Sequence, residues 1–137
     1  SAASDVYKRQ SKTSKYAAVR TKLVALQRGL AKKTDVIMDG RDIGTTVLPD
    51  AFAKIYLTAS SDARAKRRYD ELKEKGENRS FDAIKEDIEK RDYEDMHRAI
   101  SPLKQADDAV LVDTSDMNIE QVVAVLSKII DEKKAGR

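Results

Sequence analysis

Apolar residues recur along the chain at two kinds of spacing, which predict two kinds of element. From about residue 14, an apolar residue recurs every three or four positions, which predicts a helix. Its apolar stripe consists of Val19, Leu23, Leu26 and Leu30. The same spacing near the C-terminus predicts a last helix, whose buried face consists of Ile119, Val122, Val123, Leu126, Ile129 and Ile130. Short continuous apolar runs are instead typical of buried strands, and they predict strands over residues 35–39, 54–58 and 109–113.

Capping residues indicate where helices begin and end between these strands. Ser60 or Ser61 can cap one helix that Gly76 would end, and Ser80 can cap the next. Asn118, with a glutamine three residues later, forms a capping box for the last helix. Strands that alternate with helices predict βαβ units, so the expected fold class is α/β with a parallel sheet. Three short strands are few for such a sheet, which is therefore expected to be incomplete.

Composition narrows the class of protein. Forty per cent of the residues are apolar and 37% are charged, which suits amphipathic helices around a small sheet. The formal charge is only +3, and basic residues alternate with acidic ones, so broad attraction to nucleic acid is not expected. The absence of cysteine excludes disulfides and thiolate metal sites. No apolar run approaches the roughly 20 residues of a membrane span. We therefore expect a cytoplasmic protein that binds neither nucleic acid nor membranes.

The polar segment Asp39-Gly40-Arg41-Asp42-Ile43-Gly44-Thr45 directly follows the first predicted strand. Ligands of open α/β sheets bind beyond the carboxyl ends of the strands, so this segment is a candidate site. The planar guanidinium of Arg41 suits a phosphate, and Asp42 can accept a hydrogen bond from an amino group. A polar turn with an internal ion pair would contain the same residues. Spacing alone leaves both interpretations open.

One line of residues along the helix that follows Ser80 changes from apolar to charged. Spacings of three and four place on it Ile84, Ile88, Arg91, Asp95 and Arg98. A line that begins in the core and ends in charges predicts that its end emerges into a cleft. The alternative is an exposed helix with ion pairs that contribute only about 0.3–0.5 kcal/mol each. Lys85, one position off the line, is expected to lie in solvent.

Together, these two motifs resemble the bacterial-type cytidylate kinases, which phosphorylate CMP and dCMP with ATP. The resemblance covers about residues 11–132 and is carried mainly by the Gly-Arg-Asp-x-Gly-Thr element at 40–45 and the Arg-Asp-x-x-Asp-x-x-Arg helix at 91–98. It implies a P-loop kinase fold, with a parallel sheet, flanking helices and a helical lid. It also implies a protein that is cytoplasmic and, at full length, monomeric.

The resemblance divides the chain into segments. Residues 1–10 are unmatched, and their lack of periodicity and caps predicts a disordered leader or a sequence joined on from elsewhere. For the rest, the resemblance implies the end of a substrate-binding insertion and a helix at 11–34, core strands with the candidate site at 35–61, lid helices at 62–98, a core strand and helix at 99–132, and a tail at 133–137. The first strands of the family and the Gly-rich loop that cradles the ATP phosphates have no counterpart in this sequence. The chain is therefore expected to be a C-terminal part that is inactive alone.

The resemblance also implies how the acceptor nucleotide is bound. Ser11 and Arg20 would read the pyrimidine, with Asp42 accepting from the cytosine amino group. Asp95 would bind the ribose hydroxyls. The residues implied to bind phosphate and to act in catalysis are Arg41, Arg91 and Arg98.

On the donor side, the resemblance implies lid contacts from Arg64 and Arg67, of which Arg67 is the better candidate. It implies that Asp39 supports, through water, the Mg²⁺ that accompanies ATP. The residues themselves allow a second interpretation, because Arg64 and Arg67 belong to a basic cluster that a solvated helix face would also explain.

Two other functions fit parts of the sequence. A kinase for UMP or AMP would share the fold, but a carboxylate at Asp42 accepts from cytosine and repels the uracil carbonyl. A non-catalytic, charged helical module would bind nucleic acid or a partner protein. That module predicts a basic face with aromatic residues for stacking, whereas here the charges are mixed and the tyrosines are scattered.

Overall fold

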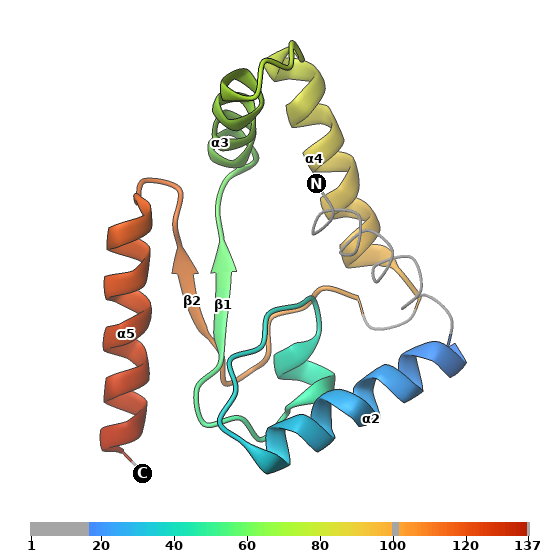
Figure 1. Ribbon diagram of the computed structural model, residues 1–137, viewed down its shortest axis with the longest axis vertical. Coiled ribbons are helices and arrows are strands. Elements are labelled where there is room, and N and C mark those ends of the chain that lie inside the picture. The colour runs from blue at the N-terminus through green and yellow to red at the C-terminus, as the bar shows by residue number, and fades with distance from the viewer. Residues whose placement is uncertain (1–16, 100–101, 137) are drawn as a thin grey trace.

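The computed structural model describes residues 17–99 and 102–136, which form an α/β arrangement (Figure 1). The elements in chain order are α2 (Ala17–Lys33), the short π-helix η1 (Ile43–Val47), β1 (Ile55–Thr58), α3 (Ser61–Glu74), α4 (Phe81–His97), β2 (Val110–Asp113) and α5 (Ile119–Ala135). The predicted leader at 1–10, Ser11 and the first predicted residues of the first helix lie outside the described residues.

The sheet consists of β1 and β2, which are parallel. Ile55 pairs with Val110 and Thr58 with Asp113, so both strands end at the same edge. Beyond that edge, the Thr114 N–H and hydroxyl both donate to the Thr58 carbonyl, at 2.8 and 3.0 Å. This confirms the predicted α/β class, the parallel sheet and two of the three predicted strands.

The predicted strand over 35–39 is wrong, because these residues are described and form no strand. A strand is defined by hydrogen bonds to a neighbour, and β1 and β2 pair with each other instead. Ile37, in the middle of the segment, is 94% exposed. The first strands of the family, which have no counterpart in this sequence, are not among the described residues to pair with this segment. An apolar run alone therefore did not make a strand here.

Helices α3 and α4 form an antiparallel hairpin that rises beyond the carboxyl edge of the sheet (Figure 1). The predicted caps are confirmed, since the Ser60 and Ser80 hydroxyls accept from backbone N–H groups three residues later, both at 3.1 Å. Gly76 follows α3 with a φ of 77°, a conformation that favours glycine.

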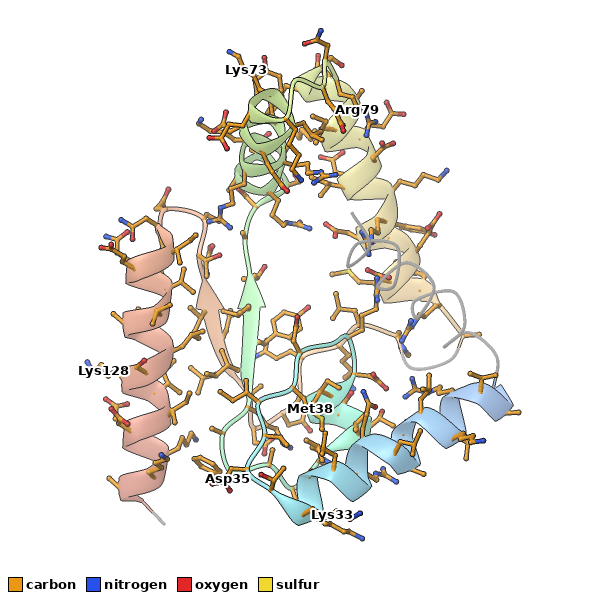
Figure 2. The ribbon with its side chains drawn as sticks, in the orientation of Figure 1. Lys33, Asp35, Met38, Lys73, Arg79 and Lys128 are labelled. Atoms are coloured by element: carbon orange, nitrogen blue, oxygen red, sulfur yellow. The ribbon has the colours of Figure 1, made fainter. Side chains whose placement is uncertain are left out.

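The hairpin buries its own core of Ala65, Leu72 and Ile84, against which Tyr69, Phe81 and Ile88 pack. Its tip carries Lys73 and Arg79 (Figure 2), and Arg79 pairs with Asp87 of α4.

Polar contacts also tie the two helices of the hairpin together. Lys85 Nζ lies 2.9 Å from Asp62 Oδ1, and the Ser61 hydroxyl donates to Glu89 Oε1 at 3.1 Å. The lysine side chain is only 34% exposed. The expectation that Lys85 lies in solvent is therefore wrong, because the adjacent helix offers it a carboxylate.

The two outer helices bury less than their apolar stripes predict. The capping box of α5 is confirmed, with Gln121 N–H donating to Asn118 Oδ1 at 2.8 Å, but no residue of α5 is buried. Ile119 is 83% exposed, and Leu26 of α2 is 63% exposed. Helix α5 lies beside β2, with Lys128 on its outer side (Figure 2). Its apolar face stays exposed because β1 and β2, with four residues each, form a sheet too narrow to cover it. None of the helices in the described part of the chain has both the length and the apolarity needed to cross a membrane.

Lys54, the residue before β1, contacts both the turn that follows η1 and the turn that precedes β2. Its side chain is only 7% exposed, and its Nζ donates to the Pro49 carbonyl and, at 2.9 Å, to Asp108 Oδ1. Its Cδ would lie 3.5 Å from a Cβ added at Gly44, so the lysine stem supports the η1 backbone. Lys54 thus holds together the turn after η1, the start of β1 and the turn before β2.

Replacing Lys54 by alanine should lower the free energy of unfolding by about 1–3 kcal/mol, because it leaves a carbonyl unpaired and removes buried packing. Lys66→Ala is the matched control, since Lys66 also pairs with an aspartate at 2.9 Å but is 73% exposed. That control should cost about 0.3–0.5 kcal/mol. Urea unfolding of both variants measures the difference, and equal losses would show that burial of Lys54 contributes nothing.

Candidate functional site

Five of the predicted site residues come together from three separate parts of the chain. They are Arg20, Arg41, Asp42, Asp95 and Arg98. The first lies on α2, the next two precede η1, and the last two lie at the end of α4. Helix α4 runs from the hairpin tip back toward α2 and η1, which brings its last turn to the polar segment (Figure 1).

Arg20 and Asp42 form a buried ion pair, with Arg20 Nη2 donating to Asp42 Oδ2. The two residues are 9% and 8% exposed. The backbone also fixes Asp42, because its carbonyl accepts from Thr46 N–H at 2.9 Å and Val47 N–H at 3.2 Å in the first turn of η1. Such π-helical turns are rare in proteins, and those that occur often lie at functional sites. The carboxylate of Asp42 is therefore held both by its own backbone and by α2.

Arg41 and Asp95 join the polar segment to α4. Arg41 Nε donates to Asp95 Oδ1 at 2.6 Å, and the side chains are 14% and 19% exposed. The contact spans 54 residues of sequence. It orients the remaining guanidinium nitrogens of Arg41 and brings the end of α4 over the start of η1.

Arg98 lies partly buried beside these two pairs. Its pKa is lowered from the ordinary arginine value, first by burial and then by the nearby charge of Arg41, with a smaller opposing effect from Asp42. The five clustered side chains comprise three arginines and two aspartates, so together they carry one excess positive charge. An anion bound at this place would favour the charged form of Arg98. The electrostatics of the cluster therefore suit an anionic ligand such as a phosphate.

Two predicted residues are not brought into this cluster. Arg91 is exposed on α4, and Asp39 is exposed in the segment before Arg41. Neither is among the charges that act on Arg98. No group of three or more histidine, cysteine, aspartate or glutamate residues that could hold a metal ion occurs within 17–99 and 102–136. Asp39 therefore belongs to no such group of three or more possible ligands.

The two predicted lid arginines bind groups at the base of the hairpin. Arg64 donates through both terminal nitrogens to the two oxygens of Asp92, at 2.8 and 2.6 Å, and this pairing raises its pKa. Arg67 donates to the Thr114 carbonyl and, at 3.5 Å, to that of Met117. Both line a cleft of about 240 Å³ between the hairpin and the carboxyl ends of the strands. Their guanidinium groups thus reach the sheet edge where ligands of this fold class bind.

Sequence reasoning missed Lys54 and Arg28. Arg28 Nε donates to the Val47 carbonyl at 2.9 Å and Arg28 Nη2 to the Thr46 carbonyl at 2.6 Å, at the end of η1. A pocket of about 460 Å³ along α2 is lined by both Arg20 and Arg28. The only signal in the sequence was that Arg28 follows Arg20 by eight residues, about two helical turns.

Comparison with known proteins gives a consistent result. A family model described as cytidylate kinase matches residues 2–132, so the match begins within the segment 1–10 that was expected to be unmatched. Relatives named cytidylate kinase include one from Lactobacillus johnsonii, 52% identical over 90% of this chain and 54% of its own length. Others are from Clostridium botulinum, 52% identical over 85% of this chain and 55% of its own length, and from Thermosipho melanesiensis, 48% identical over 90% and 57%. The chain spans about half the length of the curated relatives it matches.

Proposed function

The chain belongs to the cytidylate kinase family, and from this premise we propose that it carries the acceptor site of a kinase that transfers the ATP γ-phosphate to CMP or dCMP. The observation that supports this most directly is the cluster of three arginines and two aspartates around Asp42. A nucleoside monophosphate offers an amino group, hydroxyl groups and a dianionic phosphate. The cluster offers an acceptor and donors suited to each.

The pair Arg20 and Asp42 reads the base in this proposal. Asp42 has a second carboxylate oxygen besides the one that Arg20 holds, and it accepts from the cytosine amino group. Arg20 keeps the carboxylate oriented, and its other guanidinium nitrogen is able to donate to the cytosine carbonyl. The hydroxyl of Ser11 also binds this base, as the family resemblance implies. Uracil presents a carbonyl where cytosine has its amino group, so the same carboxylate disfavours UMP.

The remaining charged residues hold the sugar and the phosphates. Asp95 accepts from the ribose hydroxyls, while Arg41 and Arg98 donate to the CMP phosphate. Arg91, about one turn before Asp95 on α4, reaches the transferred group as the lid closes. A CMP phosphate oxygen attacks the γ-phosphorus in line, the bond from that phosphorus to the ADP oxygen breaks, and ADP leaves. The arginines neutralise the charge that builds up on these oxygens, which is what phosphoryl transfer requires.

The donor side lies at the hairpin. We assign Arg67, and with it Arg64, to the ATP phosphates on the side of the cleft beneath α3 and α4. Mg²⁺, with Asp39 as its carboxylate neighbour through water, would supply charge neutralisation at the ATP phosphates. The fold proposed is that of a P-loop kinase, in which hairpin closure keeps water from the γ-phosphate. No Gly-x-x-x-x-Gly-Lys-Ser/Thr motif occurs in residues 1–137.

Titration calorimetry of this chain with CMP, UMP, AMP and cytidine tests the acceptor site. We expect CMP to bind most tightly, cytidine more weakly because it lacks the phosphate, and UMP more weakly because it lacks the amino group. Equal affinities for CMP and cytidine would remove the phosphate role of Arg41 and Arg98. Tightest binding of UMP or AMP would assign the site to another nucleoside monophosphate, and no binding of any of them would remove the site.

Asp42→Asn should reduce the preference for CMP over UMP by about tenfold or more, since an amide can donate to the uracil carbonyl and a carboxylate cannot. The ratio of the two dissociation constants measures this independently of overall affinity. Asp50→Asn is the matched control, because Asp50 is exposed in the turn after η1. An unchanged ratio in Asp42→Asn would exclude Asp42 as the residue that reads the base.

A further inference from the structure

Helix α2 is held against η1 by two arginines, one at each end of that turn. Arg20 donates to the carboxylate of Asp42, which precedes η1, and Arg28 donates to the carbonyls of Thr46 and Val47, which end it. Eight residues separate the two arginines, which corresponds to about 12 Å along the helix axis. Two contacts this far apart fix both the position and the tilt of α2 relative to η1.

Little else holds α2 in place among the described residues. Arg20 is the one residue of α2 that is buried, and Leu26 and Leu30 are 63% and 53% exposed. These two members of the apolar stripe therefore contribute little to the placement of α2. The placement depends instead on the two arginine contacts with η1.

Arg28 also provides hydrogen-bond donors for two backbone carbonyls of η1. Val47 is only 2% exposed, and its carbonyl lies at the end of a helical turn, where carbonyls lack partners within the helix. The guanidinium fork serves both carbonyls at once, through Nε to Val47 and Nη2 to Thr46. A lysine has a single nitrogen at that place and cannot reproduce this geometry.

We propose that Arg28 is a positioning residue for base selection: it sets α2 so that Arg20 meets the carboxylate of Asp42. The proposal rests on the proposed function of that pair. Arg28 does not touch the nucleotide in this proposal. Arg28 contacts the carbonyls of Thr46 and Val47, whereas Arg20 contacts the carboxylate of Asp42. The effect of Arg28 should therefore reach the base only through the placement of α2. Loss of Arg28 should therefore change selectivity rather than phosphate binding.

The test compares Arg28→Ala and Arg28→Lys with the control Lys22→Ala, an exposed charge on the same helix. Calorimetry gives the dissociation constants for CMP and UMP. We expect Arg28→Ala to lower the selectivity ratio by about tenfold, equivalent to about 1.4 kcal/mol, with partial recovery in Arg28→Lys and no change in Lys22→Ala. A residue that only stabilised the fold would weaken CMP and UMP binding equally, and that result in Arg28→Ala would overturn the proposal.

A second measurement needs no nucleotide and so separates this proposal from the proposed function. The coupling between Arg20 and Asp42 is obtained from a double-mutant cycle in urea unfolding, once in the wild-type background and once with Arg28→Gln. If Arg28 positions α2, the coupling should fall in the second background. An unchanged coupling would reject the positioning role, even if the wild-type chain bound no CMP. A reduced coupling without CMP binding would reject only the proposed function.

Discussion

Arg98→Ala is expected to lower kcat/KM for CMP by about 30- to 1,000-fold, equivalent to about 2–4 kcal/mol of lost transition-state stabilisation. Burial and the charge of Arg41 lower the pKa of Arg98, so negative charge beside it would favour its charged form. It interacts most favourably when negative charge develops on the transferred phosphate. The measurement requires an active enzyme, for which we would join the donor-loop portion of a curated relative to this chain.

Lys90→Ala is the appropriate control for Arg98→Ala. Lys90 lies on the same helix and is exposed, whereas Lys85 is tied to Asp62 and its removal would loosen the hairpin. Lys90→Ala should change kcat/KM by less than about twofold, as expected for a surface substitution. Circular dichroism would verify folding of both variants. Similar losses in the two variants would mean that Arg98 is only part of a solvated helix face.

The largest effect on stability should follow from breaking the ion pair between Arg20 and Asp42. Asp42→Ala should lower the free energy of unfolding by about 3–5 kcal/mol, because it leaves a buried guanidinium without its carboxylate. Replacing both partners by apolar residues, as Arg20→Met with Asp42→Leu, should recover most of that loss, since neither charge is then desolvated. Chemical unfolding of the single and double variants measures both effects.

The exposed pair of Lys66 and Asp70 provides the comparison for this prediction. Its side chains are 73% and 55% exposed, and Asp70→Ala should cost at most about 1 kcal/mol. If Asp42→Ala costs no more than that, Arg20 must regain a partner or reach water in the variant. If the double variant is as unstable as the single one, shape rather than charge determines the stability of the site.

The sequence predicted which residues belong to the candidate site better than it predicted which of them contact one another. The periodic line along the second hairpin helix brought Asp95 and Arg98 to the polar segment, as expected, because helical spacing is a local property. Arg91 lies on the same line but is exposed, and it is not among the charges that act on Arg98. Arg28 and Lys54 were missed, because their acceptors are backbone carbonyls, which every residue has and no sequence pattern marks.

The sequence by itself determined the elements whose hydrogen bonds close locally. Ser60, Ser80 and the capping box at Asn118 act within three residues, and Gly76 ends α3 through its own backbone conformation. Each of these therefore formed as the local sequence predicts. The tertiary structure alone decided which apolar and charged groups found partners. Residues 35–39 have strand character but no strand beside them, Lys85 met Asp62 across the hairpin, and the apolar stripe of α5 faces two strands too narrow to bury it. Burial and pairing depend on a second segment that is distant in sequence, so no local pattern could have determined them.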